Sequence, residues 1–148
     1  MKKFRFSLEK VRRLREARLE SEQALLRSLL AEKGEVEGRW RELDQEETRV
    51  MDELRLKKVV EVQELTALEG YRRFAGLERV RLKAAAASLS DRIEKQREAL
   101  LAARRQVEAL NSLKEQRLEA WRKEVDRETE NTIAELVIAR WTAGREPA

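Results

Sequence analysis

An apolar stripe with helical spacing runs along this chain from Leu8 to about Trp141, and the only proline is Pro147. In the first half the stripe repeats every eleven residues, in three series that share this step: Leu14, Leu25 and Val36; Leu29, Trp40, Met51 and Val62; and Leu43, Leu54 and Leu65. Eleven residues in three turns, about 3.67 per turn, make such a seam nearly straight or weakly right-handed. The pattern predicts a long coiled-coil helix rather than a globular core.

The second half of the stripe begins closer to a heptad. Ile93, Leu100 and Val107 lie seven apart, with Leu89, Ala103 and Leu110 between them, and eleven-residue steps return through Leu118, Val125 and Leu136. One uninterrupted helix of about 135 residues would be about 200 Å long, whereas a chain folded near its middle buries each half of the stripe on the other. The prediction is an all-α fold, in which two long helices form an antiparallel coiled-coil hairpin and residues 1–148 form a single domain.

Local signals predict where the helices begin. Ser7 is a suitable N-cap for helix 1, Glu9 lies in the first turn, and Phe6 and Val11 occupy the two positions of a hydrophobic staple. For the turn, two alternatives stay open on pattern alone. Gly70 and Gly76 are backbone breakers, whereas the capping-box sequence Thr66-Ala67-Leu68-Glu69 would start helix 2 near residue 67 and put the turn between Lys57 and Leu65.

Composition narrows the classes of function. The chain has 42% charged residues, five glycines, and neither cysteine nor histidine, which excludes thiolate and imidazole chemistry and disulfides. A site made of carboxylates alone needs a concave, dry setting that exposed rods do not provide. We therefore predict no enzymatic activity, no metal and no cofactor. With no apolar window of 18 residues and no signal-peptide pattern, the chain is expected to stay where it is made.

The N-terminus is strongly basic. Residues 1–18 carry eight basic and two acidic side chains, a net charge of +6, whereas residues 19–62 carry twelve acids and eight bases. Such a cluster suits nucleic acid, an anionic membrane surface or an acidic protein. Because Arg12, Arg13 and Arg15 point around the helix rather than forming one row, the pattern disfavours nucleic acid and membrane and favours an acidic protein partner.

Two aromatic groups have both structural and functional interpretations. Tyr71, Phe74 and Leu77 recur every three residues near the expected tip, where they either form a docking site or close the seam. Trp40 and Trp121 fall on the stripe and are interpreted as core. Trp141 lies close to the C-terminal end, where it either needs a partner or frays.

Four short motifs, in this order and spacing, resemble the FliJ family, the small coiled-coil component of the bacterial flagellar export apparatus. They are Phe4-Arg5-Phe6 with Leu8-Glu9-Lys10-Val11 and Leu14-Arg15-Glu16; Tyr71-Arg72-Arg73-Phe74; Leu113-Lys114-Glu115-Gln116-Arg117-Leu118-Glu119-Ala120-Trp121-Arg122; and Ile133-Ala134-Glu135-Leu136. The last motif departs from the family at Ala134, where an acidic residue is usual. The resemblance covers nearly the whole chain.

The resemblance implies an antiparallel two-helix hairpin similar to the stalk of rotary ATPases, with its turn before Tyr71. Helix 1 is then expected at about 7–58, the turn at about 58–66 and helix 2 at about 67–140, followed by a short tail. The paired terminal ends would enter the centre of the hexameric export ATPase, and the region of Tyr71 and Phe74 would dock on the export gate. The implied ATPase-binding residues are Leu8, Arg12, Arg13, Arg15, Arg117 and Trp121, and the implied gate-binding residues are Tyr71, Phe74 and Leu77.

The resemblance also implies further partners and a location. It implies an escort role for export chaperones, a monomeric hairpin when free, and a place in the bacterial cytoplasm, peripheral at the inner face of the membrane that holds the apparatus. Two rival functions remain: a coiled-coil scaffold that self-associates through its stripe, and a basic coiled coil associated with nucleic acid.

Overall fold

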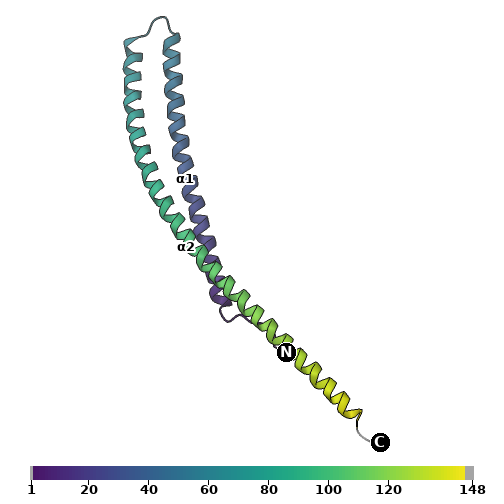
Figure 1. Ribbon diagram of the computed structural model, residues 1–148. Helices are drawn as coiled ribbons and strands as arrows, with labels where there is room; N and C mark the ends of the chain where they lie inside the picture. The colour runs from purple at the N-terminus through teal and green to yellow at the C-terminus, as the bar shows by residue number, and fades with distance from the viewer. Residues whose placement is uncertain (1, 146–148) are drawn as a thin grey trace. The chain divides into compact units, whose positions relative to one another are not determined.

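The computed structural model describes residues 2–145 and is all-α (Figure 1), with helix α1 at Glu9–Leu56 and helix α2 at Val62–Ala143. The predicted helical hairpin is confirmed. The chain packs as two compact units. The turn unit is Glu20–Ala102, and the terminal unit is Met1–Leu19 with Ala103–Ala148. Pro147, the only proline of the chain, lies outside the described residues.

The first helix begins two residues later than predicted. The carbonyl of Leu8 accepts a hydrogen bond from the amide of Arg12 at 2.8 Å, so Leu8 holds the N-cap position. The predicted cap at Ser7 is therefore wrong. Instead, the Ser7 hydroxyl accepts a hydrogen bond at 2.8 Å from the guanidinium of Arg117, on α2.

The second helix begins five residues earlier than predicted. The carbonyl of Glu61 accepts a hydrogen bond from the amide of Leu65 at 3.2 Å, which opens α2 at Val62. Thr66 is thus inside the helix, where its hydroxyl donates to the carbonyl of Val62 at 2.9 Å instead of capping an amide. Placing the turn at Gly70 or Gly76 is also wrong, since both are helical.

The turn itself consists of Lys57, Lys58, Val59, Val60 and Glu61, without glycine or proline. Both valines are β-branched and therefore poorer helix formers than the residues before them. An ion pair of 2.7 Å joins the ammonium of Lys57 to the carboxylate of Glu64 across the turn, and its hydrogen bond raises the pKa of the lysine. The turn is thus formed by an ion pair and by residues of weak helix propensity, and not by the glycines considered from sequence.

The core of the turn unit consists of two clusters along the seam. In one, Leu43 and Ala75 are fully buried and Leu82 nearly so, and the partly buried side chains packed against them belong to Val36, Trp40 and Tyr71. In the other, Leu29, Leu89 and Ile93 are buried. Two of the eleven-residue series, through Leu29 and through Leu43, thus lie on the seam in α1, and Trp40 is confirmed as a core residue. The third series lies toward its edge, with Leu14 69% exposed.

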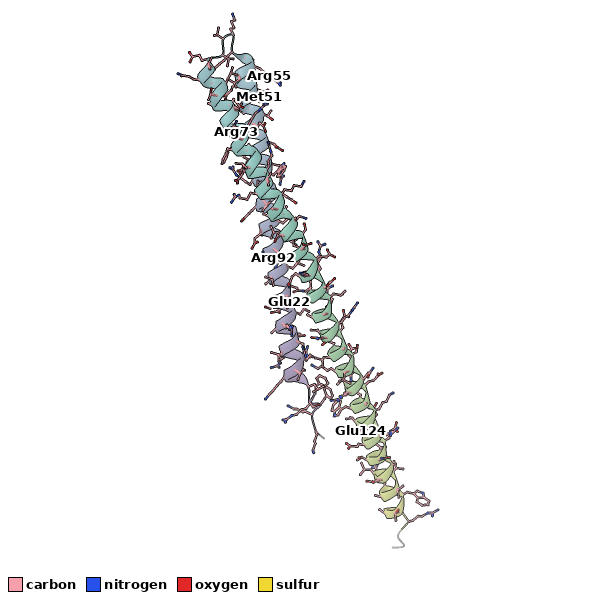
Figure 2. All side chains as sticks on the ribbon, turned by 90° about the vertical axis from the view of Figure 1, so that its left-hand side faces the viewer. Glu22, Met51, Arg55, Arg73, Arg92 and Glu124 are labelled. Carbon is pink, nitrogen blue, oxygen red and sulfur yellow. The ribbon has the colours of Figure 1, made fainter. Side chains whose placement is uncertain are left out.

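A buried polar side chain interrupts the apolar seam. Gln96 is 8% exposed, and its amide donates to the backbone carbonyl of Glu22 at 3.0 Å and also to the Glu22 carboxylate. Figure 2 labels Glu22 on α1. A polar group at a seam position favours the one register in which its hydrogen bonds are made. The sequence analysis did not identify this residue.

Within residues 2–145, neither helix contains a stretch that is both long and apolar enough to cross a bilayer.

Candidate functional site

An extended N-terminal segment lies against α2 in the terminal unit. Phe6 is buried at 8% exposure, and the guanidinium carbon of Arg117 lies 5.6 Å from the centre of its ring. Phe4 lies 6.0 Å from Trp121, measured between ring centroids, with the rings tilted by 53°. These contacts attach the basic residues Lys2, Lys3 and Arg5 to the flank of α2, where they border a groove with Glu124 and Glu128.

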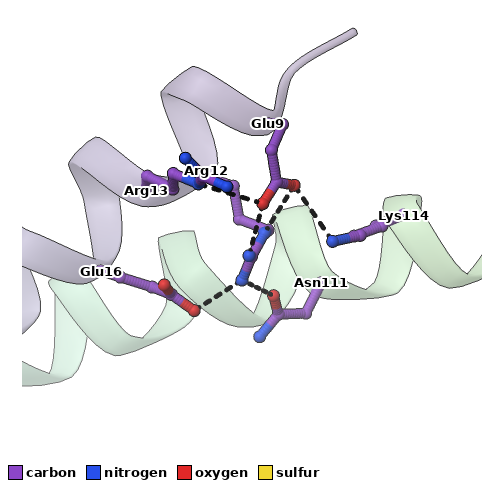
Figure 3. A network of polar contacts seen from close by, with 6 residues as sticks. All are labelled: Glu9, Arg12, Arg13, Glu16, Asn111 and Lys114. Atoms are coloured by element: carbon purple, nitrogen blue, oxygen red, sulfur yellow. Dashed lines mark hydrogen bonds and ion pairs between the residues drawn. The ribbon is translucent and has the colours of Figure 1, made fainter. Parts of the chain in front are cut away.

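The first turn of α1 is joined to α2 by a network centred on Glu9 (Figure 3). Arg12 donates to both Glu9 carboxylate oxygens, at 2.6 and 3.0 Å, and to Glu16 at 2.6 Å. From α2, Lys114 donates to Glu9 at 3.1 Å and Asn111 accepts from Arg12 at 3.4 Å. Bidentate, charge-assisted contacts of this kind orient the side chains as well as attract them. The network holds Arg12 on the seam.

The Glu9 network makes the terminal unit sensitive to acid. Hydrogen bonds from Arg12 and then Lys114 lower the pKa of Glu9 from its ordinary 4.5 to about 2. A carboxyl whose pKa is lower folded than unfolded stabilises the fold above the unfolded value, and this stabilisation is lost as the pH falls through the folded value. We therefore expect the terminal unit to lose stability between pH 4.5 and about 2. Carboxyl chemical shifts should show Glu9 titrating near pH 2.

A matched variant checks this assignment. Glu9→Gln should be less stable than the parent at neutral pH, and the difference should disappear on acidification as the parent Glu9 becomes protonated. A Glu9 midpoint near the ordinary value of 4.5 would contradict the network.

All six residues predicted to bind an ATPase lie in the terminal unit, but their exposure and contacts differ. The side chain of Arg12 is 18% exposed within its network, whereas that of Arg13 is 75% exposed and 3.5 Å from Glu9. Arg15 donates to Gln106 of α2 at 2.9 Å. The other three are Leu8 at the N-cap, Arg117 against Phe6, and Trp121, half-buried against Phe4. Among the three α1 arginines of this set, Arg12 and Arg15 contact α2, whereas Arg13 contacts Glu9 of its own helix and is the most open to a partner.

The three predicted gate-binding residues lie in the turn unit and differ in orientation. Tyr71 packs on the buried cluster and its hydroxyl donates to Glu46 at 3.0 Å. Burial, followed by the contact with Glu46, raises the pKa of the Tyr71 phenol. Phe74 and Leu77 are instead 51% and 74% exposed. Tyr71 therefore supports the seam, while Phe74 and Leu77 are available to a partner.

Val80 extends this exposed row, and the sequence analysis did not identify it. It is 68% exposed and follows Leu77 by three residues, as Leu77 follows Phe74. Neighbours three apart lie along one side of a helix. The i, i+3 spacing was the signal that could have found Val80.

An ion-pair cluster also missed from sequence fastens α1 to α2 beside this row. Arg79 donates to Asp44 at 2.8 Å and to Glu47, and Arg72 approaches Glu47 at 3.8 Å. The contact with Glu47, followed by that with Asp44, raises the pKa of Arg79. These two bases therefore link α2 to α1 within the turn unit.

Within residues 2–145, no group of three or more acidic side chains is arranged to hold a metal ion. Comparison with protein-family models, with curated proteins and with solved structures finds no significant match.

Proposed function

We propose that this chain is a non-enzymatic stalk of a bacterial type III protein export apparatus of the flagellar kind, as its resemblance to the FliJ family suggests. In this role it inserts into the hexameric export ATPase, stimulates it, links it to the export gate and helps to escort export chaperones. The observation that carries the proposal is the terminal unit itself, where the basic N-terminal segment lies on the part of α2 around Arg117 and Trp121.

The geometry suits a shaft in a ring. Helices stiffened by a seam insert without the cost of ordering a flexible chain. The net charge of +6 in residues 1–18 would be attracted to carboxylates lining a ring interior. A single rod among six equivalent subunits must contact them unequally, and a ligand that prefers one conformation shifts each subunit's populations. Stimulation of the ATPase then requires no catalytic group on the rod.

The exposed row in the turn unit is the proposed contact with the export gate. Phe74 and Leu77 offer apolar surface, and neither is needed to complete the buried cluster behind them. Exposed apolar side chains at helical spacing are typical anchors for a helix that docks in a groove. In this proposal the protein works in the bacterial cytoplasm, peripheral at the inner membrane.

Charge reversal at two α1 arginines tests the contact with the ATPase. In Arg13→Glu/Arg15→Glu, we expect stimulation of the hexameric flagellar export ATPase to fall about tenfold, because attraction to ring carboxylates becomes repulsion. Steady-state ATP hydrolysis by the ATPase, titrated with each variant, measures this. Far-UV circular dichroism should show unchanged helicity, since Arg13 is largely exposed and the Arg15 contact is on the surface.

The matched control carries the same change of charge elsewhere. Lys95→Glu/Arg97→Glu has the same two-residue spacing, on exposed positions of α2 in the turn unit, and should stimulate like the parent. A pull-down of the export ATPase by the parent chain is the companion measurement. Failure to capture the ATPase, or equal stimulation by all three proteins, would contradict the proposed role.

A further inference from the structure

The end of α2 carries apolar side chains that no other described part of the terminal unit buries. From Asp126 to Ala143, a segment we call the overhang, every residue of α2 is exposed. Figures 1 and 2 show this end of α2 running on without a neighbouring helix. The exposed apolar side chains of the overhang, each 55% to 63% exposed, are Ile133, Leu136, Val137, Ile138 and Trp141.

Two of these side chains, Ile133 and Leu136, continue the seam of the terminal unit. The buried and half-buried apolar positions of that seam on α2 include Val107, Leu110, Leu118, Trp121 and Val125. Steps of three or four residues carry the same side of the helix forward from Val125 through Thr129, Ile133, Leu136 and Arg140. Farther back along α2, Asn111 and Lys114 contact α1, which runs antiparallel, and at Trp121 the extended N-terminal segment takes its place. An antiparallel helix is therefore an occupant that the continuation fits.

We propose that this occupant is the overhang of a second copy of the chain, so that two copies pair antiparallel about a two-fold axis. Core positions in antiparallel pairs alternate between the two helices, which sets Ile133 of each copy against Leu136 of the other. In that register Arg140 lies opposite Thr129. A two-fold axis satisfies both halves of the contact with one self-complementary surface.

The charges of the overhang select this orientation. Its first part carries three acids, Asp126, Glu128 and Glu130, against one base, Arg127, and its end is basic at Arg140 and, just beyond, Arg145. Antiparallel pairing puts Arg140 of one copy between Asp126 and Glu130 of the other, twice by symmetry. Parallel pairing would set acid against acid. Opposite charges across an interface fix its orientation more than they add affinity.

The contact is expected to be reversible. Each copy buries a few aliphatic side chains, far less than a permanent dimer interface, and Arg145 already covers the Trp141 ring, with its guanidinium carbon 3.7 Å from the ring centre. The inference goes beyond the proposed function and does not depend on it. It adds a concentration-dependent dimer to the monomeric hairpin that the resemblance implies.

Sedimentation equilibrium of the full chain, alone and without any ATPase, tests the pairing. The parent should show a monomer–dimer equilibrium that weakens as salt is raised. Asp126→Lys/Glu130→Lys should weaken dimerisation about tenfold or more, since two symmetric attractions become repulsions, and Arg140→Glu should do the same. A mixture of the two variants should restore the dimer, because each then presents the charges that the other lacks.

Glu135→Lys is the matched control, since helical spacing places Glu135 on the far side of the helix from Ile133. It should dimerise like the parent, and circular dichroism should show equal helicity for all variants. A parent that stays monomeric at every concentration overturns the proposal. It is also overturned if Glu135→Lys weakens the dimer equally, or if mixing the two complementary variants restores nothing, because the interface then lies elsewhere.

Discussion

Replacing Leu43 with alanine is expected to lower the free energy of unfolding of the turn unit by about 2 to 5 kcal/mol. Leu43 is fully buried and lies in a cluster with Ala75 and Leu82. The truncation removes apolar contacts and leaves a cavity between two stiff helices, which have few neighbouring side chains that can move in to fill it. Urea unfolding followed by circular dichroism at 222 nm, a wavelength standard for helix, measures the loss.

The control for this prediction is Leu56→Ala, the same truncation at a position that is 85% exposed at the end of α1. It should change the unfolding free energy by less than about 0.5 kcal/mol, as substitutions of exposed residues usually do. If the two variants unfold at the same urea concentration, Leu43 does not support the seam as the structure describes.

Replacing Phe6 with alanine is expected to release the N-terminal segment from α2. Phe6 is the buried side chain of that segment, and its truncation exposes the face of α2 that carries Arg117. A buried Phe→Ala change costs about 3 to 5 kcal/mol, which exceeds what a short segment without internal hydrogen bonds can recover. Trypsin should then cut after Lys2, Lys3 and Arg5 much faster than in the parent, as mass spectrometry of a timed digest would show.

Phe74→Ala provides the comparison, because it removes the same side chain from a position that is 51% exposed in the turn unit. Its N-terminal cleavage should match that of the parent. Equal cleavage of the parent and Phe6→Ala would mean that the segment is already detached in solution.

The helical hairpin could be predicted from sequence because its cause is periodic. Apolar residues three or four apart produce a stripe, and a stripe must be buried on something. The stripe does not depend on any single residue. The prediction of a hairpin is therefore correct even though Leu14 is exposed and the polar Gln96 lies within the seam. Gln96 itself was missed because its partner, Glu22, is 74 residues away in sequence.

The helix ends were predicted less well because local motifs compete with contacts that sequence does not display. Ser7 had the right chemistry for a cap, but its hydroxyl accepts from Arg117, 110 residues later. At the turn, the residues that begin with Thr66 have the sequence of a capping box. The second helix nevertheless begins earlier, at Val62, because the ion pair between Lys57 and Glu64 and two β-branched valines form the turn before it.

The prediction of the candidate sites was also limited by contacts between residues that are distant in sequence. Arg12 and Arg13 are neighbours of identical type, and nothing in the sequence distinguishes their roles. The structure separates them only because Asn111 and Lys114, on the other helix, lie beside the Arg12 and Glu9 pair. Which arginine is engaged and which is exposed is therefore a property of the packed hairpin.

Across the hairpin, the residues in contact are farther apart in sequence the farther the contact lies from the turn. The sequence separation is 7 residues for Lys57 and Glu64, 25 for Tyr71 and Glu46, and 110 for Arg117 and Ser7. Because the entropy of closing a loop rises with its length, contacts near the turn form before the loops that join the ends can close. The hairpin is thus expected to zip from the turn toward the termini. By the same ordering, the N-terminal segment and its neighbours on α2 open first and most often, so slow hydrogen exchange should be confined to the turn unit.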